Sequence, residues 1–250
     1  MPPIFLTAQW RHLAMINFEI DPDVLLPLVP AGTDLDYFHG RTFVSLVGFR
    51  FLDTRLKGWP IPWHRQFEEV NLRFYLRREA GGELRRGVAF IKEIAPRAAV
   101  CTVARWVYGE NYVTLPMRHE IRQSDDQASA SYAWKFRGRW NEMLVRGQGQ
   151  PQPAVPGSEE EFIIEHYWGY TRRSERKTLE YHVAHPRWRV WRDCESKMDV
   201  DVGELYGPEF EEAMRQAPSS CLLADGSEIT VHAGEKLNLA SKLAVPLGGS

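Results

Sequence analysis

Residues 69–77 read Glu-Val-Asn-Leu-Arg-Phe-Tyr-Leu-Arg, and polar and apolar side chains alternate along them. A two-residue period is typical of a β-strand, whose successive side chains point to opposite faces. One face carries Val70, Leu72, Phe74 and Leu76. The other carries Glu69, Asn71, Arg73 and Tyr75. The segment therefore predicts a strand with one apolar and one largely polar face.

Further strand patterns lie on both sides of this segment. Residues 42–51 form an apolar run that predicts a strand buried on both faces. The glycine pair at 81–82 predicts a hairpin turn into a strand with Lys92 on an otherwise apolar face. Later strands are expected at residues 112–121, 129–137, 139–146, 178–184 and 188–201, with a last hairpin across residues 225–226.

Short helices interrupt these strands. Capping residues and helical spacing predict them at residues 22–26, 96–108, 158–166 and 208–216. Strands and helices do not alternate regularly along the sequence. This pattern indicates an α+β fold with a mainly antiparallel, closed or nearly closed sheet. The Gly-, Gln- and Pro-rich residues 147–157 form a linker-like stretch within a single domain of residues 1–250.

The composition excludes several classes of protein. Of the 250 residues, 44% are hydrophobic, which suffices for one sizeable core. The 31 basic and 33 acidic residues are interspersed and give a net charge of −2, so we expect no nucleic-acid partner. The sequence shows neither an apolar run near the roughly 18 residues of a membrane span nor a secretory signal. We therefore expect a cytoplasmic protein without a membrane partner.

Motifs for metals and common cofactors are also missing from the sequence. The three cysteines are far apart, and His182 and His185 point to opposite faces if their segment is a strand. The chain contains no HExxH, GxSxG, Walker A or GxGxxG motif. We therefore expect no metal and no cofactor.

The polar face of residues 69–75 and Lys92 are the first candidates for a functional site. If that face lies inside a closed sheet, its carboxylate, amide and guanidinium project into one space. On a one-sided sheet the same face meets solvent. A lysine among apolar residues favours its neutral, nucleophilic form, although the Lys92 amine can equally reach water or pair with a carboxylate. The Pro- and Trp-rich residues 59–64 predict a loop that covers apolar surface and could act as a lid.

Several short motifs, in order along almost the whole chain, carry a family resemblance. They include Trp10-Arg11-His12-Leu13, Glu69-x-Asn71-Leu72-Arg73-x-Tyr75, residues 87–94, residues 108–112, His166-Tyr167-Trp168-Gly169-Tyr170 and His185-Pro186-Arg187-Trp188. In these segments the chain resembles the YqjF-like family, which has no established activity. That family is distantly similar to acetoacetate decarboxylase, and the resemblance implies a mostly antiparallel β-structure around an internal pocket.

The same resemblance implies a Schiff-base lysine in the turn after a helix. The matching turn here, residues 109–112, reads Gly-Glu-Asn-Tyr and contains no lysine. The decarboxylase mechanism therefore does not follow from the resemblance.

Together these observations predict an interior pocket for a small carboxylate or carbonyl compound. We expect it to be bordered by Glu69, Asn71, Arg73, Lys92, Arg105, Tyr108, Glu110 and Tyr112. Arg73 or Arg105 would hold the anion of the ligand. Glu69 or Glu110 would act as acid or base, and Lys92 would be an electrostatic or covalent partner. Asn71, Tyr108 and Tyr112 would contact the ligand.

A protein with this pocket is either a lyase-like enzyme that acts on the compound or a binding module that senses it without turnover. Alternatively it is a structural protein that forms homo-oligomers, in which the polar face makes buried ion pairs. A cavity smaller than roughly 300 Å³ would favour this last interpretation.

Overall fold

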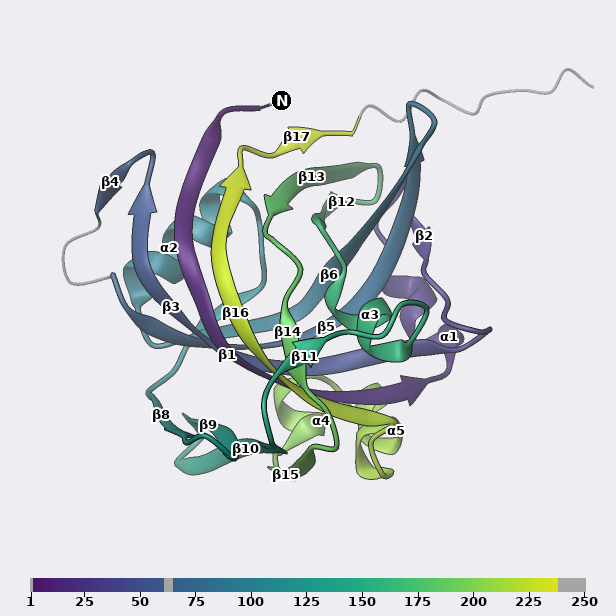
Figure 1. Ribbon diagram of the computed structural model, residues 1–250. Coiled ribbons are helices and arrows are strands. Elements are labelled where there is room, and N and C mark those ends of the chain that lie inside the picture. Colours follow the sequence, from purple (N-terminus) through teal and green to yellow (C-terminus); the bar gives the residue numbers. More distant parts are fainter. Residues whose placement is uncertain (1, 61–64, 238–250) are drawn as a thin grey trace, which may run out of the picture.

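The computed structural model describes residues 2–60 and 65–237. Its larger sheet curls into a nearly closed ring, visible from one end in Figure 1. The strands of the ring, in order of pairing, are β16 (Ser220–His232), β1 (Ile4–Ile20), β3 (Thr42–Leu56), β5 (Phe67–Ala80), β6 (Glu83–Ala95), β12 (Trp168–Ser174) and β13 (Lys177–Ala184). Strand β13 then pairs with β16 and closes the ring.

Short strands and a second sheet surround this ring. The edge strands are β2 (Asp34–Leu35), β4 (Trp59–Pro60), β7 (Tyr112–Thr114), β11 (Gln152–Pro153), β14 (Arg189–Trp191) and β17 (Glu235–Lys236). The second sheet contains β15 (Glu195–Asp199), β10 (Arg139–Gln148), β9 (Gln127–Phe136) and β8 (Met117–Gln123), all antiparallel. Only the pairings of β6 with β12 and with β7 are parallel within the described residues.

The helices are short and peripheral. They are α1 (Pro22–Leu25), η1 (Leu26–Leu28), α2 (Ala98–Val107), α3 (Glu159–Ile164), α4 (Val202–Leu205), η2 (Pro208–Phe210) and α5 (Glu211–Arg215). Asp21 and Ser158 cap α1 and α3 with their side-chain oxygens, as the sequence predicts. The predicted α+β class with a mainly antiparallel, nearly closed sheet is confirmed.

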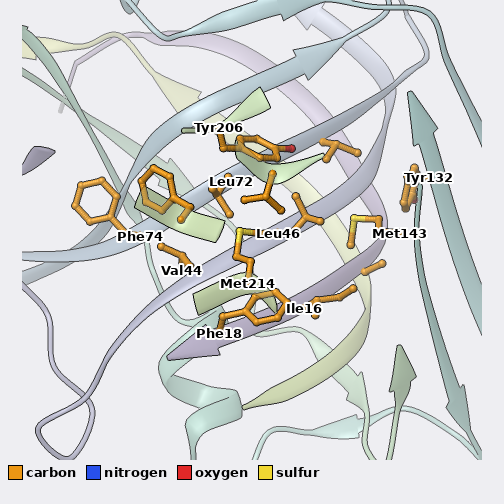
Figure 2. Close-up of a cluster of buried hydrophobic side chains, with 14 of the residues drawn as sticks. Ile16, Phe18, Val44, Leu46, Leu72, Phe74, Tyr132, Met143, Tyr206 and Met214 are labelled. Atoms are coloured by element: carbon orange, nitrogen blue, oxygen red, sulfur yellow. The ribbon is translucent and has the colours of Figure 1, made fainter. Parts of the chain in front are cut away.

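Each face of the ring belongs to a different apolar cluster. The outward side chains of β1, β3 and β5, such as Ile16, Leu46 and Leu72, pack against Tyr132 and Met143 of the second sheet and against residues of the C-terminal helices (Figure 2). The inward side chains form a second cluster around the interior. The strand predicted at residues 42–51 is buried on both faces because both clusters use it.

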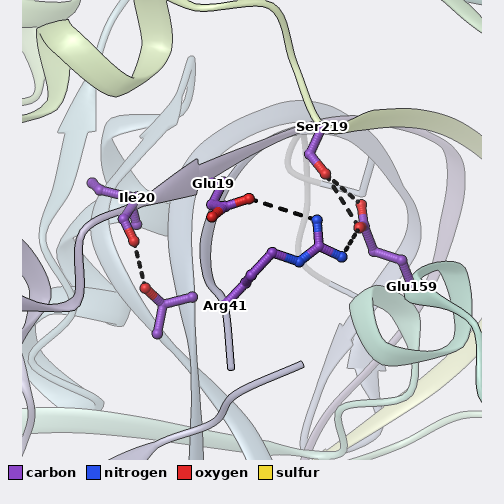
Figure 3. A network of polar contacts seen from close by, with 6 residues as sticks. Glu19, Ile20, Arg41, Glu159 and Ser219 are labelled. Atoms are coloured by element: carbon purple, nitrogen blue, oxygen red, sulfur yellow. Dashed lines mark hydrogen bonds and ion pairs between the residues drawn. The ribbon is translucent and has the colours of Figure 1, made fainter. Parts of the chain in front are cut away.

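Polar contacts join the ring to the helices at its edge. The Arg41 guanidinium lies 3.6 Å from Oε2 of Glu19 and 3.2 Å from Oε2 of Glu159 (Figure 3). The Ser219 hydroxyl donates to the same Glu159 carboxylate. The Arg41 guanidinium therefore joins β1 to α3, and Glu159 joins α3 to Ser219, the residue before β16.

Three predictions about strands are wrong in detail. Residues 225–226 form no hairpin, because β16 continues through Gly226, whose φ of +76° fits it closely against the backbone of Trp10 in β1. The strand predicted at residues 112–121 divides at Pro116 into β7 and β8, which belong to different sheets. The strand predicted at residues 188–201 likewise divides into β14 and β15.

The predicted loop at residues 59–64 is only partly described. Trp59 and Pro60 form β4, which pairs with the end of β3, and residues 61–64 lie outside the described residues. No helix in the described ranges has the length and apolarity needed to cross a membrane.

Candidate functional site

The inward face of the ring and one face of α2 surround a cavity of about 220 Å³. This is below the roughly 300 Å³ of pockets for drug-sized ligands but above the roughly 150 Å³ of a protein cavity that holds benzene. Most of its wall is apolar or aromatic, with Phe5, Trp10, Leu13, Val47, Phe49, Phe51, Phe67, Val88, Phe90, Val100, Val103 and Val231. By the size criterion given above, this volume taken alone favours the structural interpretation, and it can hold only a compact small molecule with an apolar body.

Strand β5 directs its polar face into this cavity. Glu69, Asn71 and Arg73 are 2%, 2% and 9% exposed, and all three line the cavity. Their apolar neighbours Leu72 and Phe74 lie in the cluster outside the ring. The alternation that predicts a polar strand face therefore places three functional groups in the interior.

The segment after α2 contributes a second carboxyl group and its hydroxyl partners. Tyr108, Glu110 and Tyr112 line the cavity. The Tyr112 hydroxyl donates to Oε2 of Glu69 at 2.6 Å. The Tyr181 hydroxyl donates to Oε1 of Glu110 at 2.9 Å. The two glutamates are thus held by tyrosine hydroxyls in place of cations.

Glu93 is a third cavity-lining carboxyl group that the sequence analysis misses. It is 3% exposed and lies directly across from Asn71 on the neighbouring strand. Its Oε2 has no hydrogen-bond partner within the described parts of the chain. We call Glu69, Glu93, Glu110 and Asn71 the acidic end of the cavity.

A bulge in β6 explains both this omission and the misplacement of Lys92. Arg73 pairs with Phe90, whereas Leu72 pairs with Lys92, so Ile91 is an extra residue in β6. A bulge of one residue exchanges the two faces of the strand beyond it. Lys92 therefore points out of the ring, where its Nζ donates to the carbonyl of Leu205.

The predictions that Lys92 and Arg105 border the pocket are thus wrong. Arg105 is exposed on α2, and its Nε donates to the carbonyl of Cys101 in its own helix. The residues of α2 that line the cavity are Ala99, Val100, Val103 and Ala104. No lysine lines the cavity among the residues that the structure describes.

Burial sets the protonation of the acidic end. Desolvation raises the pKa of Glu69 and of Glu110 to about 7, against the hydrogen bonds that each carboxylate accepts. Desolvation and the nearby Glu110 and Glu69 raise the pKa of Glu93 well above its usual range. The end therefore holds protons near neutral pH and can both give and accept them.

Arg73 and two histidines form the other polar part of the lining. Nη2 of Arg73 donates to the carbonyl of Ile163 at 3.2 Å, and its Nε has no partner among the described residues. His166 and His185 line the same cavity. Desolvation lowers the pKa of His166 to about 4, so its imidazole is neutral at pH 7. We call Arg73, His166 and His185 the basic end.

The histidine pair of the sequence does not assemble into a metal site. His185 lines the cavity, whereas His182 belongs to a separate pocket with Arg85 and Glu235. Across the described ranges, no three His, Cys, Asp or Glu side chains are arranged to hold a metal ion.

Comparisons with known proteins agree with this architecture. The model of the DUF2071 family, described as uncharacterized conserved proteins, matches residues 7–228. The uncharacterized protein YqjF of Bacillus subtilis (strain 168) is 24% identical over 232 residues, which cover 87% of this chain and 89% of YqjF.

The fold is similar to solved structures of acetoacetate decarboxylase-like enzymes. Acetoacetate decarboxylase from Legionella pneumophila has a TM-score of 0.62 at 12% identity, covering 95% of this chain and 88% of that one. An acetoacetate decarboxylase-like enzyme from Sphingomonas wittichii RW1 has a TM-score of 0.64 at 11% identity, covering 93% and 92%. The enduracididine biosynthesis enzyme MppR, complexed with pyruvate, has a TM-score of 0.63 at 13% identity, covering 95% and 91%. By the match of the family model to residues 7–228, the chain belongs to the DUF2071 family, and its fold is similar to that of acetoacetate decarboxylase-like enzymes.

Proposed function

We propose that the protein binds a small carboxylate or carbonyl compound in the cavity of the ring and transfers protons to and from it. The observation that carries this proposal is the meeting of three buried carboxyl groups and a buried arginine in one apolar cavity. Titratable groups with shifted pKa values in a cavity are typical of sites where protons move.

Each end of the cavity has a distinct part in this proposal. The Arg73 guanidinium lines the cavity, and its charge and N–H groups are suited to a carboxylate or carbonyl oxygen of the ligand. Glu69 and Glu110, with pKa values near 7, exchange a proton with the carbon next to a carbonyl. Tyr112 orients the Glu69 carboxyl group through its hydrogen bond.

The comparisons support the ligand class, while the residues that line the cavity argue against the decarboxylase mechanism. The structure of MppR holds pyruvate in a similar fold, and the resemblance to acetoacetate decarboxylase implies an internal site at a comparable place. The Schiff-base lysine of that enzyme has no counterpart in the described lining, because Lys92 points away from it. Proton transfer by carboxyl groups is the chemistry that the remaining residues support.

Ligand binding by two cavity variants tests this proposal. Pyruvate, acetoacetate and small ketones are titrated into the wild-type protein, Arg73→Ala and Glu69→Ala, with exposed Glu175→Gln as a charge control. We expect the carboxylates to lose at least roughly tenfold in affinity with Arg73→Ala. Wild-type affinity in both cavity variants would refute the placement of the site.

Exchange of ligand protons distinguishes an enzyme from a binding module. In deuterated water, the carbon next to the carbonyl gains deuterium if the glutamates abstract and return its proton. Saturable binding without exchange or product would instead favour the sensor function, which the missing lysine also favours. Nuclear magnetic resonance of the ligand measures both.

A further inference from the structure

Two buried acceptor atoms at the acidic end lack donors. Oδ1 of Asn71 and Oε2 of Glu93 have no hydrogen-bond partner in the described chain, although the side chains are 2% and 3% exposed. Nδ2 of Asn71 donates to Oε1 of Glu69 at 3.1 Å. Buried polar atoms without partners are costly, so a ligand with donor groups gains by filling this place.

The two side chains are neighbours across strands β5 and β6, and both belong to residues that line the cavity. Asn71 and Glu93 are directly paired across β5 and β6, where opposite Cβ atoms are roughly 5 Å apart. Both residues line the cavity. Neighbouring side chains shield both oxygen atoms, so a ligand group with two N–H donors meets both acceptors once those side chains shift.

The surrounding charge also favours a cation. Glu69, Glu93 and Glu110 influence one another electrostatically, and the tyrosine hydroxyls that bond Glu69 and Glu110 carry no positive charge. Arg173, whose charge acts on Glu110, is exposed. The acidic end therefore has less positive charge than its carboxylates require when they ionise.

Aromatic side chains complete this environment. Phe67, Tyr108 and Tyr181 line the same cavity. The faces of aromatic rings attract organic cations, most strongly when water is excluded. An apolar body bearing a protonated amine matches both the wall and the carboxyl groups.

We propose that the acidic end binds the protonated amino group of a small organic ligand, with Glu93 and Asn71 as its acceptors. This inference rests on the proposed function only in taking the cavity as a small-molecule site, and it adds an amine to the ligand. Because the basic end can hold a carboxylate while the acidic end holds the amino group, the ligands we propose are small amines and amino carboxylates.

Protonation of the acidic end links this binding to proton release. The titratable groups that face Glu93 are Glu69 on β5, Glu110 and Tyr112 after α2, Cys101 on α2 and Tyr181 on β13. Their mutual burial keeps the carboxyl groups protonated near neutral pH, as their raised pKa values indicate. An ammonium group stabilises the ionised carboxylate, so its binding should displace a proton.

Calorimetry with matched probes tests the inference. Isobutylamine and its neutral analogue isobutanol are titrated into the wild-type protein, Glu93→Gln and the exposed control Glu175→Gln. We expect the amine to bind at least roughly tenfold more tightly than the alcohol, and Glu93→Gln to remove that preference. Glu175→Gln should behave like the wild type. Equal affinity for amine and alcohol in the wild type would overturn the inference.

A second measurement uses only the wild-type protein. Titrations of isobutylamine at pH 7 in two buffers of different ionisation enthalpy give the number of protons released, which should approach about one for the amine. Binding of the amine without proton release would contradict the inference even if Glu93→Gln fails to fold. If amines do not bind while carboxylates bind in an Arg73-dependent way, this inference fails and the proposed function stands. If amines bind and carboxylates and ketones do not, this inference stands and the proposed function fails.

Discussion

At the scale of single residues, the unusual feature is a set of carboxyl groups inside an apolar cavity. Glu69 and Glu110 are bonded by the hydroxyls of Tyr112 and Tyr181, and neither forms an ion pair with a buried cation in the described chain. Hydroxyl donors stabilise a carboxylate less than a cation does, so burial dominates and the proton stays bound. This arrangement makes the stability of the fold depend on pH.

Glu69→Gln should stabilise the protein more at high pH than at low pH. Desolvation raises the folded-state pKa of Glu69 from 4.5 to about 7. Its ionisation in the unfolded state therefore removes stability as the pH rises from about 4.5 to about 7, and the loss persists above. The variant should be close to the wild type near pH 4.5 and gain about 3 kcal/mol at pH 8. Urea denaturation across this range measures the difference.

The control for this prediction is Glu175→Gln, because Glu175 is exposed. It should show little change in stability between the two pH values. A difference between Glu69→Gln and the wild type that stays constant with pH would contradict the account.

Lys92→Met should leave the cavity intact. The Lys92 amine donates to the carbonyl of Leu205 outside the ring, so its loss should cost roughly 1 kcal/mol of stability and leave ligand affinity unchanged. Borohydride treatment with a carbonyl ligand should trap no adduct at Lys92. An adduct on this residue, found by mass spectrometry, would show that the bulge in β6 is misplaced.

At the scale of secondary structure, period and capping predict most elements but not their irregularities. The alternation at residues 69–77 locates β5 and its inward face, because that face carries polar groups into the cavity while the opposite face packs in an apolar cluster. The bulge at Ile91 cannot be predicted in this way: Val88, Phe90, Lys92 and Ile94 remain a regular pattern in the sequence. A bulge such as the one at Ile91 depends on how β6 pairs with β5, which its own sequence does not encode. Because the bulge turns Glu93 toward the cavity, the third carboxyl group could not be predicted either.

The prediction at Gly226 failed for a related reason. An Asp-Gly pair favours a tight turn, and Gly226 indeed has φ of +76°. Here the same conformation serves close contact between β16 and β1, because a Cβ atom at this position would lie 2.0 Å from the Trp10 carbonyl oxygen. The Asp-Gly pair predicts the positive φ at Gly226, but whether this conformation makes a turn or a close strand contact depends on the neighbouring strand.

Gly226→Ala should therefore destabilise the protein strongly, with Gly40→Ala as a matched control. Both glycines have positive φ, at +76° and +81°, but a Cβ at Gly40 meets no atom within 4 Å. The control should lose roughly 1 kcal/mol from its backbone conformation alone. Gly226→Ala should lose at least roughly 2 kcal/mol more, because the β1 backbone must move. Equal losses in urea denaturation would show that the strands are not in such close contact.

At the scale of the whole molecule, the ring separates a filled core from a cavity. Leu72 is fully buried in the cluster outside the ring, and Leu13 is 2% exposed at the wall of the cavity. Leu72→Ala should cost roughly 2 to 5 kcal/mol. Leu13→Ala should cost less, because a side chain beside empty space makes fewer contacts.

The two leucine variants should also differ in binding. Leu13→Ala enlarges the cavity, so a ligand with one or two more methylene groups should gain affinity relative to the wild type. Leu72→Ala should leave this preference unchanged. Denaturation and calorimetry on the same samples measure both effects, and an unchanged size preference in Leu13→Ala would mean that the ligand binds elsewhere.

The pairing of the ring is uneven around its circumference. The hairpin of β12 and β13 joins β6 through two residue pairs and β16 through two, whereas β1 pairs along most of its length with both neighbours. Fluctuations that break few backbone hydrogen bonds cost least. A displacement of this hairpin away from β6 and β16 would carry Tyr181 and Thr171 with it and break their hydrogen bonds to Glu110. The same displacement would then open the interior to a ligand and change the pKa of Glu110.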